Sequence, residues 1–113
     1  MQDNPITAQH LDHLEELFVR YGAVSTELNS RNRALLDERQ IYERNGRYYR
    51  AGIAVFEGTP FLIISTTDNE KFASVGIMED IDALPLDLDQ DRMEKAVRYA
   101  LGVEPYPEQY PDY

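Results

Sequence analysis

The chain has 113 residues, 42% of them hydrophobic and 28% charged, which fits one globular domain and excludes a chain that is disordered throughout. Its 21 acidic and 11 basic residues give a formal net charge of -10, which opposes binding to bare nucleic acid and to anionic membrane surfaces. The absence of cysteine excludes disulfides, thiolate catalysis and cysteine-ligated metal sites, and it is compatible with a cytoplasmic location.

The segment ITAQHLDHLEELFVRYG, residues 6–22, predicts the first helix. Its apolar residues recur at spacings of three and four: Leu11, Leu14, Leu17, Phe18 and Tyr21. Asn4 or Thr7 can cap the first turn, and Gly22 suits the left-handed residue that follows a last turn. We therefore expect a helix over residues 8–21.

Residues 23–38 give a weaker signal that leans towards a second helix. Four apolar residues, Val24, Leu28, Leu35 and Leu36, have helical spacing. The serine, threonine and asparagine side chains between them compete with helical hydrogen bonds, so one or two helices are expected at this end of the chain.

The segment RQIYERNGRYYR, residues 39–50, predicts a β-hairpin. Asn45 and Gly46 supply the two positive φ angles of a type I′ turn, and the isoleucine and tyrosines beside them favour strands. The two-residue loop fixes the register: Glu43 opposite Tyr48, Tyr42 opposite Tyr49, and Ile41 opposite Arg50.

Further strands are expected after this hairpin. Residues 53–56 continue its second strand, a turn follows at residues 57–60, and the apolar run at residues 61–64 predicts a central strand. A second turn at residues 68–71 is expected to lead into a strand over residues 72–78. Such short connections imply antiparallel neighbours.

A helical period returns near the C-terminus, carried by Met93, Ala96, Val97, Ala100 and Leu101. Asp89 or Asp91 can cap its start, and Gly102 can end it. The elements predict an α+β two-layer sandwich with one or two N-terminal helices, an antiparallel meander of about four strands and a C-terminal helix. We expect one domain over residues 1–103 and a proline- and tyrosine-rich acidic tail over residues 104–113.

The candidate metal and catalytic motifs fail on residue type or spacing. His10, His13 and Glu16 are spaced by three, but H-L-D-H is not the H-E-x-x-H of a zinc protease, and the three side chains do not converge on one helix face. The acids in DLDQDRME, residues 87–94, resemble the start of a calcium loop without its glycine and final glutamate, so helix capping explains them.

The sequence also contains no motif that is typical of a hydrolase. Ser65, Thr66 and Thr67 have neither a G-x-S-x-G turn nor a glycine-rich phosphate loop around them, and they fit the polar end of a strand. We therefore predict no catalytic residues, no metal site and no cofactor.

Charge is segregated along the chain. Residues 31–50 hold six arginines and three acids, whereas residues 79–113 hold ten acids and three bases. The hairpin combines arginine with tyrosine, a mixture common at protein–protein hot spots, although it also fits a plain solvated hairpin. The tail can cross its own domain, bind a partner or fray at the chain end. These considerations predict a set of partner-binding residues: Arg44, Arg47, Tyr48, Tyr49, Arg50, Tyr106, Tyr110 and Tyr113.

Together these patterns lead to two hypotheses. The first is a non-enzymatic, cytoplasmic protein-interaction module, an adaptor, inhibitor or regulatory partner, which binds a protein with a basic or aromatic surface or a second copy of itself. It would bind neither nucleic acid nor membrane. No run approaches the roughly 18 apolar residues of a membrane span, and we expect no export signal. The alternative is a small enzyme or ligand-binding domain with a pocket between helix and sheet.

Overall fold

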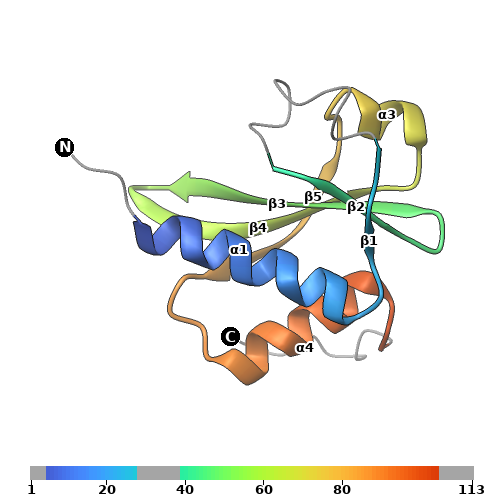
Figure 1. Ribbon diagram of the computed structural model, residues 1–113. Coiled ribbons are helices and arrows are strands. Elements are labelled where there is room, and N and C mark those ends of the chain that lie inside the picture. The colour runs from blue at the N-terminus through green and yellow to red at the C-terminus, as the bar shows by residue number, and fades with distance from the viewer. Residues whose placement is uncertain (1–4, 28–38, 105–113) are drawn as a thin grey trace.

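The computed structural model describes residues 5–27 and 39–104 (Figure 1). Its elements, in chain order, are α1 (Pro5–Arg20), β1 (Val24–Ser25), β2 (Ile41–Arg44), β3 (Arg47–Phe56), β4 (Thr59–Thr67), α3 (Glu70–Ser74), β5 (Glu79–Pro85) and α4 (Gln90–Leu101). The strands form one antiparallel sheet in the order β1-β2-β3-β4-β5. Helices α1 and α4 lie against the same face of this sheet (Figure 1). The predicted α+β sandwich is therefore confirmed, with five described strands in place of about four.

The core fills the space between the two helices and the sheet. The apolar stripe of α1 buries Leu14, Leu17 and Phe18 completely. The Phe18 ring lies edge-on to Tyr42 of β2 at 5.7 Å between ring centroids, an arrangement that aromatic pairs prefer. The sheet and α4 supply most of the other core residues: Tyr49, Ala51, Leu62, Ile64, Leu84, Met93, Ala96, Val97, Ala100 and Leu101.

The β2–β3 hairpin and α4 form at the residues that the turn and capping signals predicted. All three predicted cross-strand pairs of the hairpin are present, and Asn45 and Gly46 have φ angles of 55° and 82°. Helix α4 begins after Asp89, whose carboxylate accepts a hydrogen bond from the Arg92 amide at 2.9 Å. It ends at Gly102, which adopts the left-handed conformation with a φ of 80°.

The helix expected over residues 23–38 is wrong at residues 24–25, which form strand β1. Gly22, with a φ of 105°, ends α1 and turns the chain back along the sheet. Strand β1 then pairs its Val24 with Glu43 of β2. The unpaired edge of β2 offers these residues backbone partners, and that pairing prevails over a weak helical pattern. Residues 28–38 lie outside the described part of the chain.

The strand expected over residues 72–78 is also wrong. A short helix, α3, occupies its first part because the Asn69 side chain accepts a hydrogen bond from the Phe72 amide at 3.0 Å and caps the first turn. Gly76, with a φ of 81°, then redirects the chain into β5. Helix α3 lies on the sheet face opposite α1 and α4 (Figure 1), where Ala73 packs against Ile41.

The β3–β4 turn contains a strained residue that generates a stability prediction. Glu57 has a φ of 52° and precedes Gly58 with a φ of 83°, so this is a second turn with two positive φ angles. Glu57→Asn is expected to raise the free energy of unfolding by about 1 kcal/mol, because asparagine adopts this conformation more readily than glutamate. Urea unfolding measures the change. Glu57→Ala is the control, because alanine does not share the preference of asparagine for a positive φ. An equal rise in the unfolding free energy of Glu57→Ala would contradict this explanation.

Candidate functional site

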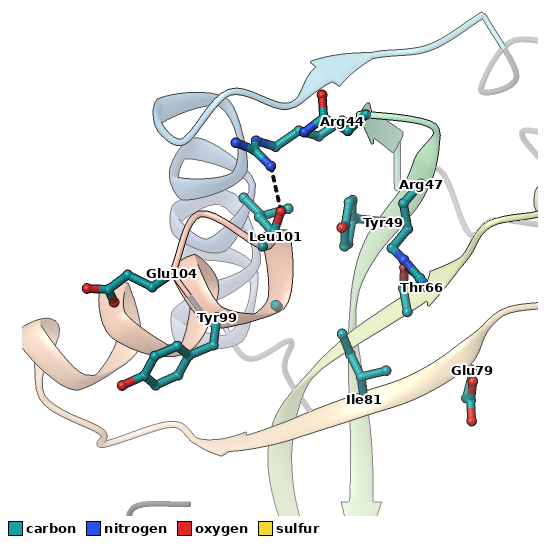
Figure 2. A pocket seen from close by; sticks show the side chains of 12 residues that line it. Arg44, Arg47, Tyr49, Thr66, Glu79, Ile81, Tyr99, Leu101 and Glu104 are labelled. Carbon is teal, nitrogen blue, oxygen red and sulfur yellow. Dashed lines mark hydrogen bonds between the residues drawn. The ribbon is translucent and has the colours of Figure 1, made fainter. Parts of the chain in front are cut away.

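A hollow opens between the C-terminal end of α4 and the β2–β3 hairpin (Figure 2). Its volume is about 680 Å³, within the roughly 300–1,000 Å³ range of ligand pockets. The hairpin, the end of β4, the start of β5 and the end of α4 supply its lining: Arg44, Asn45, Arg47, Tyr49, Thr66, Glu79, Ile81, Tyr99, Ala100, Leu101, Gly102 and Glu104. Elements far apart in sequence thus build one depression at the end of the sheet.

A second hollow, of about 470 Å³, adjoins the first and shares Arg47, Thr66 and Glu79 with it. It continues from these shared residues to Phe72 and Ile77 beside α3. We call the two hollows together the sheet-end groove. One end of this groove lies under α4 and the other lies against α3.

Arg44 is fixed by the ends of both long helices. Its Nη1 donates a hydrogen bond to the carbonyl oxygen of Leu101 at 2.8 Å, at the negative end of α4 (Figure 2). A Cβ on Gly22, at the end of α1, would lie 3.2 Å from Arg44 Nε, and one on Gly102 would lie 3.9 Å from Nη1. The guanidinium therefore lies beside the last turns of both helices, and a side chain at Gly22 would crowd it.

Arg47 differs from Arg44 because its side chain is exposed. Its Nη1 lies 3.4 Å from Thr66 Oγ1, a long hydrogen bond, and that hydroxyl donates to the Tyr48 carbonyl at 2.8 Å. Glu79 stands opposite Thr66 in the β4–β5 register. The middle of the sheet-end groove thus contains both the exposed Arg47 and the carboxylate of Glu79.

The structure divides the predicted partner-binding residues of the hairpin between two faces. Arg44, Arg47 and Tyr49 line the sheet-end groove. Tyr48 and Arg50 point to the opposite sheet face, since side chains alternate along a strand. Tyr49 is only 2% exposed and contributes mainly to the core. Three further predicted residues lie outside the described part of the chain: Tyr106, Tyr110 and Tyr113. A binding role for this set stays a prediction.

Sequence reasoning missed an exposed apolar patch at the α3 end of the groove. Phe72, Val75 and Ile77 are 50%, 50% and 58% exposed, and the Ile77 amide donates to the Phe72 carbonyl at 2.9 Å. We call these three residues the α3 patch. They were expected in a strand, where alternate side chains are buried. The helix-capping Asn69 and the turn-forming Gly76 were the available signals for a different conformation.

A polar network ties the α4 wall of the groove to α1. The Tyr21 hydroxyl donates to Glu94 Oε1 at 2.9 Å and accepts from Arg98 Nη1 at 3.1 Å. Arg98 Nε donates to Glu104 at 3.2 Å, and Arg20 pairs with Glu94 at 3.1 Å. Hydrogen bonds to Tyr21 and Glu104 raise the pKa of Arg98. The network positions Glu104 at the rim of the groove.

The residues tested as metal ligands have other contacts. His13 Nε2 lies 2.9 Å from Gln90 Oε1, and its Nδ1 lies 3.7 Å from Glu16. Asp89 of the calcium-like segment caps α4. Within residues 5–27 and 39–104, no group of three or more histidine, cysteine, aspartate or glutamate side chains is arranged to hold a metal ion.

The hydroxyls near the end of β4 are also engaged. Ser65 donates to Asp80 Oδ1 at 2.7 Å, and Thr66 donates to the Tyr48 carbonyl. Among the described residues that line the sheet-end groove, none is a histidine, a cysteine or a serine. The arrangement can present charge and apolar surface to a ligand, and the Thr66 hydroxyl within it already donates to a backbone carbonyl.

A separate charged cluster lies where α1 meets β2. Arg39 Nη1 is 3.0 Å from Asp12 and 3.4 Å from Glu15. Burial raises the pKa of Glu15 although Arg39 opposes the shift, and burial together with Glu15 raises the pKa of Tyr42. These residues do not line the sheet-end groove.

The chain matches no protein-family model, no curated protein and no solved structure. Among the described helices, none is both long enough and apolar enough to cross a membrane. The function must therefore be argued from the geometry of the groove.

The two groove arginines are expected to respond differently to the same substitution. Arg44→Met should lower the free energy of unfolding by about 2–3 kcal/mol, because it removes a charged hydrogen bond and leaves the Leu101 carbonyl without that donor. Arg47→Met, at an exposed site, should change it by no more than about 0.5 kcal/mol. Urea unfolding of both variants measures this contrast. Equal losses would show that Arg44 does not fix the helix ends.

The polar network predicts a pH dependence. Hydrogen bonds from Gln90 and Tyr21, together with Arg20, lower the pKa of Glu94 below its ordinary value of 4.5. A lowered pKa stabilises the fold above about pH 4.5, and this contribution is lost as the pH falls through the folded-state value. The melting temperature of Glu94→Gln should therefore lie below that of the wild type at pH 7, and the difference should shrink in acid. Glu27→Gln, at an exposed carboxylate, should show no such convergence. If the melting temperature of Glu94→Gln lies below that of the wild type by the same amount at every pH, Glu94 does not cause the pH dependence.

Proposed function

We propose that this protein is a non-enzymatic, acidic interaction module that binds another protein through the sheet-end groove. The observation that carries the proposal is the α3 patch: its three apolar side chains are half exposed, and two of them, Phe72 and Ile77, line the same hollow as the exposed Arg47. Arginine and aromatic side chains are enriched at protein interfaces, and exposed apolar groups that lie together favour removal from water. The patch and the groove together offer both kinds of contact.

The charge of the molecule favours a protein over a nucleic acid as the partner. The net charge is -10, and the groove itself contains Glu79 and Glu104. A polyphosphate backbone would be repelled by this surface, whereas a protein segment with basic or aromatic side chains would be attracted. We propose the cytoplasm as the location, since a chain without cysteine gains no disulfide from an oxidising compartment.

A second candidate is supported by the α4 end of the groove. The hollow there lies between helix and sheet and has the volume of a small-molecule pocket, with Tyr99 and Ile81 in its lining. A small ligand bound there at ~100 times its Kd would add about 2.7 kcal/mol to the stability. A thermal-shift screen of metabolites and divalent cations separates this function from protein binding, because it needs no partner protein.

The α3 patch gives the test of the protein-binding function. Phe72→Ser combined with Ile77→Ser should reduce binding of the partner at least about tenfold, because truncating an interface hot spot costs about 2 kcal/mol or more. Both side chains are half exposed, so the unfolding free energy should change little. Affinity capture from native lysate, mass-spectrometric identification and reconstitution with the purified partner measure the effect.

The matched control is Val19→Ser, which removes a 54% exposed apolar side chain from α1, away from the groove. This variant should bind the partner as the wild type does. Equal binding by the wild type and the Phe72→Ser, Ile77→Ser variant would exclude the α3 patch as the binding surface. A monomer with no stoichiometric partner at physiological salt would exclude the interaction function itself.

A further inference from the structure

Strand β5 is one edge of the described sheet. It spans seven residues and pairs with β4 on one side. Within the described part of the chain, no strand pairs with its other side. The opposite edge, β1, has only two residues. An edge strand presents alternate backbone N–H and C=O groups outward, so β5 is the longer of the two surfaces on which the described sheet can be extended.

The side chains of β5 select against pairing with a second copy of itself. The strand contains Glu79, Asp80 and Asp82 and no basic residue. Two such strands side by side would bring carboxylates together, and like charges across a strand pair are destabilising. A segment rich in lysine or arginine would meet opposite charge at the same positions. The edge is therefore blocked to self-association and complementary to a basic strand.

The α3 patch lies at the N-terminal end of this edge. Ile77 is joined to Phe72 by a backbone hydrogen bond, and only Met78 separates it from the first residue of β5. The groove between them also contains Glu79. A strand laid along β5 thus reaches half-exposed apolar surface where β5 begins. Peptides that extend a sheet gain affinity from main-chain hydrogen bonds and specificity from side-chain contacts of this kind.

We infer that the β5 edge takes an extended basic segment of another protein as a sixth strand, with an apolar side chain at its end seated against Phe72 and Ile77. This inference rests on the proposed interaction function and names the chemistry of its partner. The carboxylates give the charge complementarity, the edge gives the backbone pairing, and the α3 patch gives the apolar anchor.

The test uses the full-length chain and a synthetic peptide that alternates lysine with valine, matches β5 in length and carries one terminal phenylalanine. Fluorescence anisotropy should show saturable binding that weakens at high salt, because exposed charges are screened. Hydrogen exchange of the β5 amides should slow when the peptide is bound. A peptide with glutamate in place of lysine should not bind.

Backbone methylation separates strand addition from charge attraction alone. The same peptide with N-methyl groups on alternate residues keeps its charge but cannot donate to β5, and it should bind at least about tenfold more weakly. Equal binding of the methylated peptide, or β5 amides that exchange at unchanged rates, would overturn the inference. Failure of the unmethylated peptide to bind would also overturn it, since the acids would then only protect the edge.

Charge variants locate the contact. Glu79→Gln combined with Asp80→Asn should weaken peptide binding about three- to tenfold, and the amide oxygen introduced by Asp80→Asn can still accept the Ser65 hydrogen bond. Glu27→Gln combined with Glu57→Gln removes the same charge elsewhere and should change binding less than about twofold. Equal weakening by both variants would place the peptide elsewhere. If peptide binding fails but Phe72→Ser with Ile77→Ser still abolishes partner capture, the strand-addition inference is wrong and the interaction function stands.

Discussion

The rest of the structure depends on the Arg44 guanidinium, which lies where α1 and α4 both end. Both helices run towards the β2–β3 hairpin (Figure 1), so their negative ends meet beside this one cation. A side chain at Gly22 would crowd the arginine, whereas one at Gly102 would be in ordinary contact with it. Helix α4 ends at Gly102 beside this contact, and the sheet-end groove opens between that helix end, the hairpin and the start of β5.

The sequence predicted the parts of the fold that local chemistry determines. The Asn45-Gly46 turn fixed the β2–β3 register, and Asp89 and Gly102 fixed the limits of α4. Strand β1 could not be predicted, because its two residues become a strand only by pairing with β2. Strand β5 was missed because EDIDALP lacks regular apolar alternation: it carries three acids, and its register against β4 shifts between Ile64 and Ser65. The candidate site was less predictable still. Arg44 and Arg47 carry similar sequence signals, and only the contact with Leu101, 57 residues away, separates their roles.

The carboxylates that make up the net charge of -10 differ in their surroundings. Glu94 and Glu104 are held by Arg20 and Arg98 in the network that joins α1 to α4. Such carboxylates are already neutralised by neighbouring cations and attract a partner weakly. Glu79 and Asp80, by contrast, lie on an edge strand of the described sheet that contains no basic residue. Only a small part of the total charge therefore sets the electrostatic field that a partner meets at the surface. For this reason the composition indicated an acidic protein but did not indicate its binding surface.

The α3 patch is carried by the least buried helix of the described structure. Helix α3 has five residues and fully buries only Ala73, and its first turn depends on the Asn69 cap. Few buried contacts make a segment low in local stability, so α3 can adjust to a bound side chain at small energetic cost. The Arg44 side of the groove is held by both long helices and cannot adjust in this way. A partner that enters the groove would therefore contact a rigid wall at α4 and an adaptable apolar wall at α3. The α3 wall would select the apolar side chain of the partner, and the α4 wall would set the orientation of the partner.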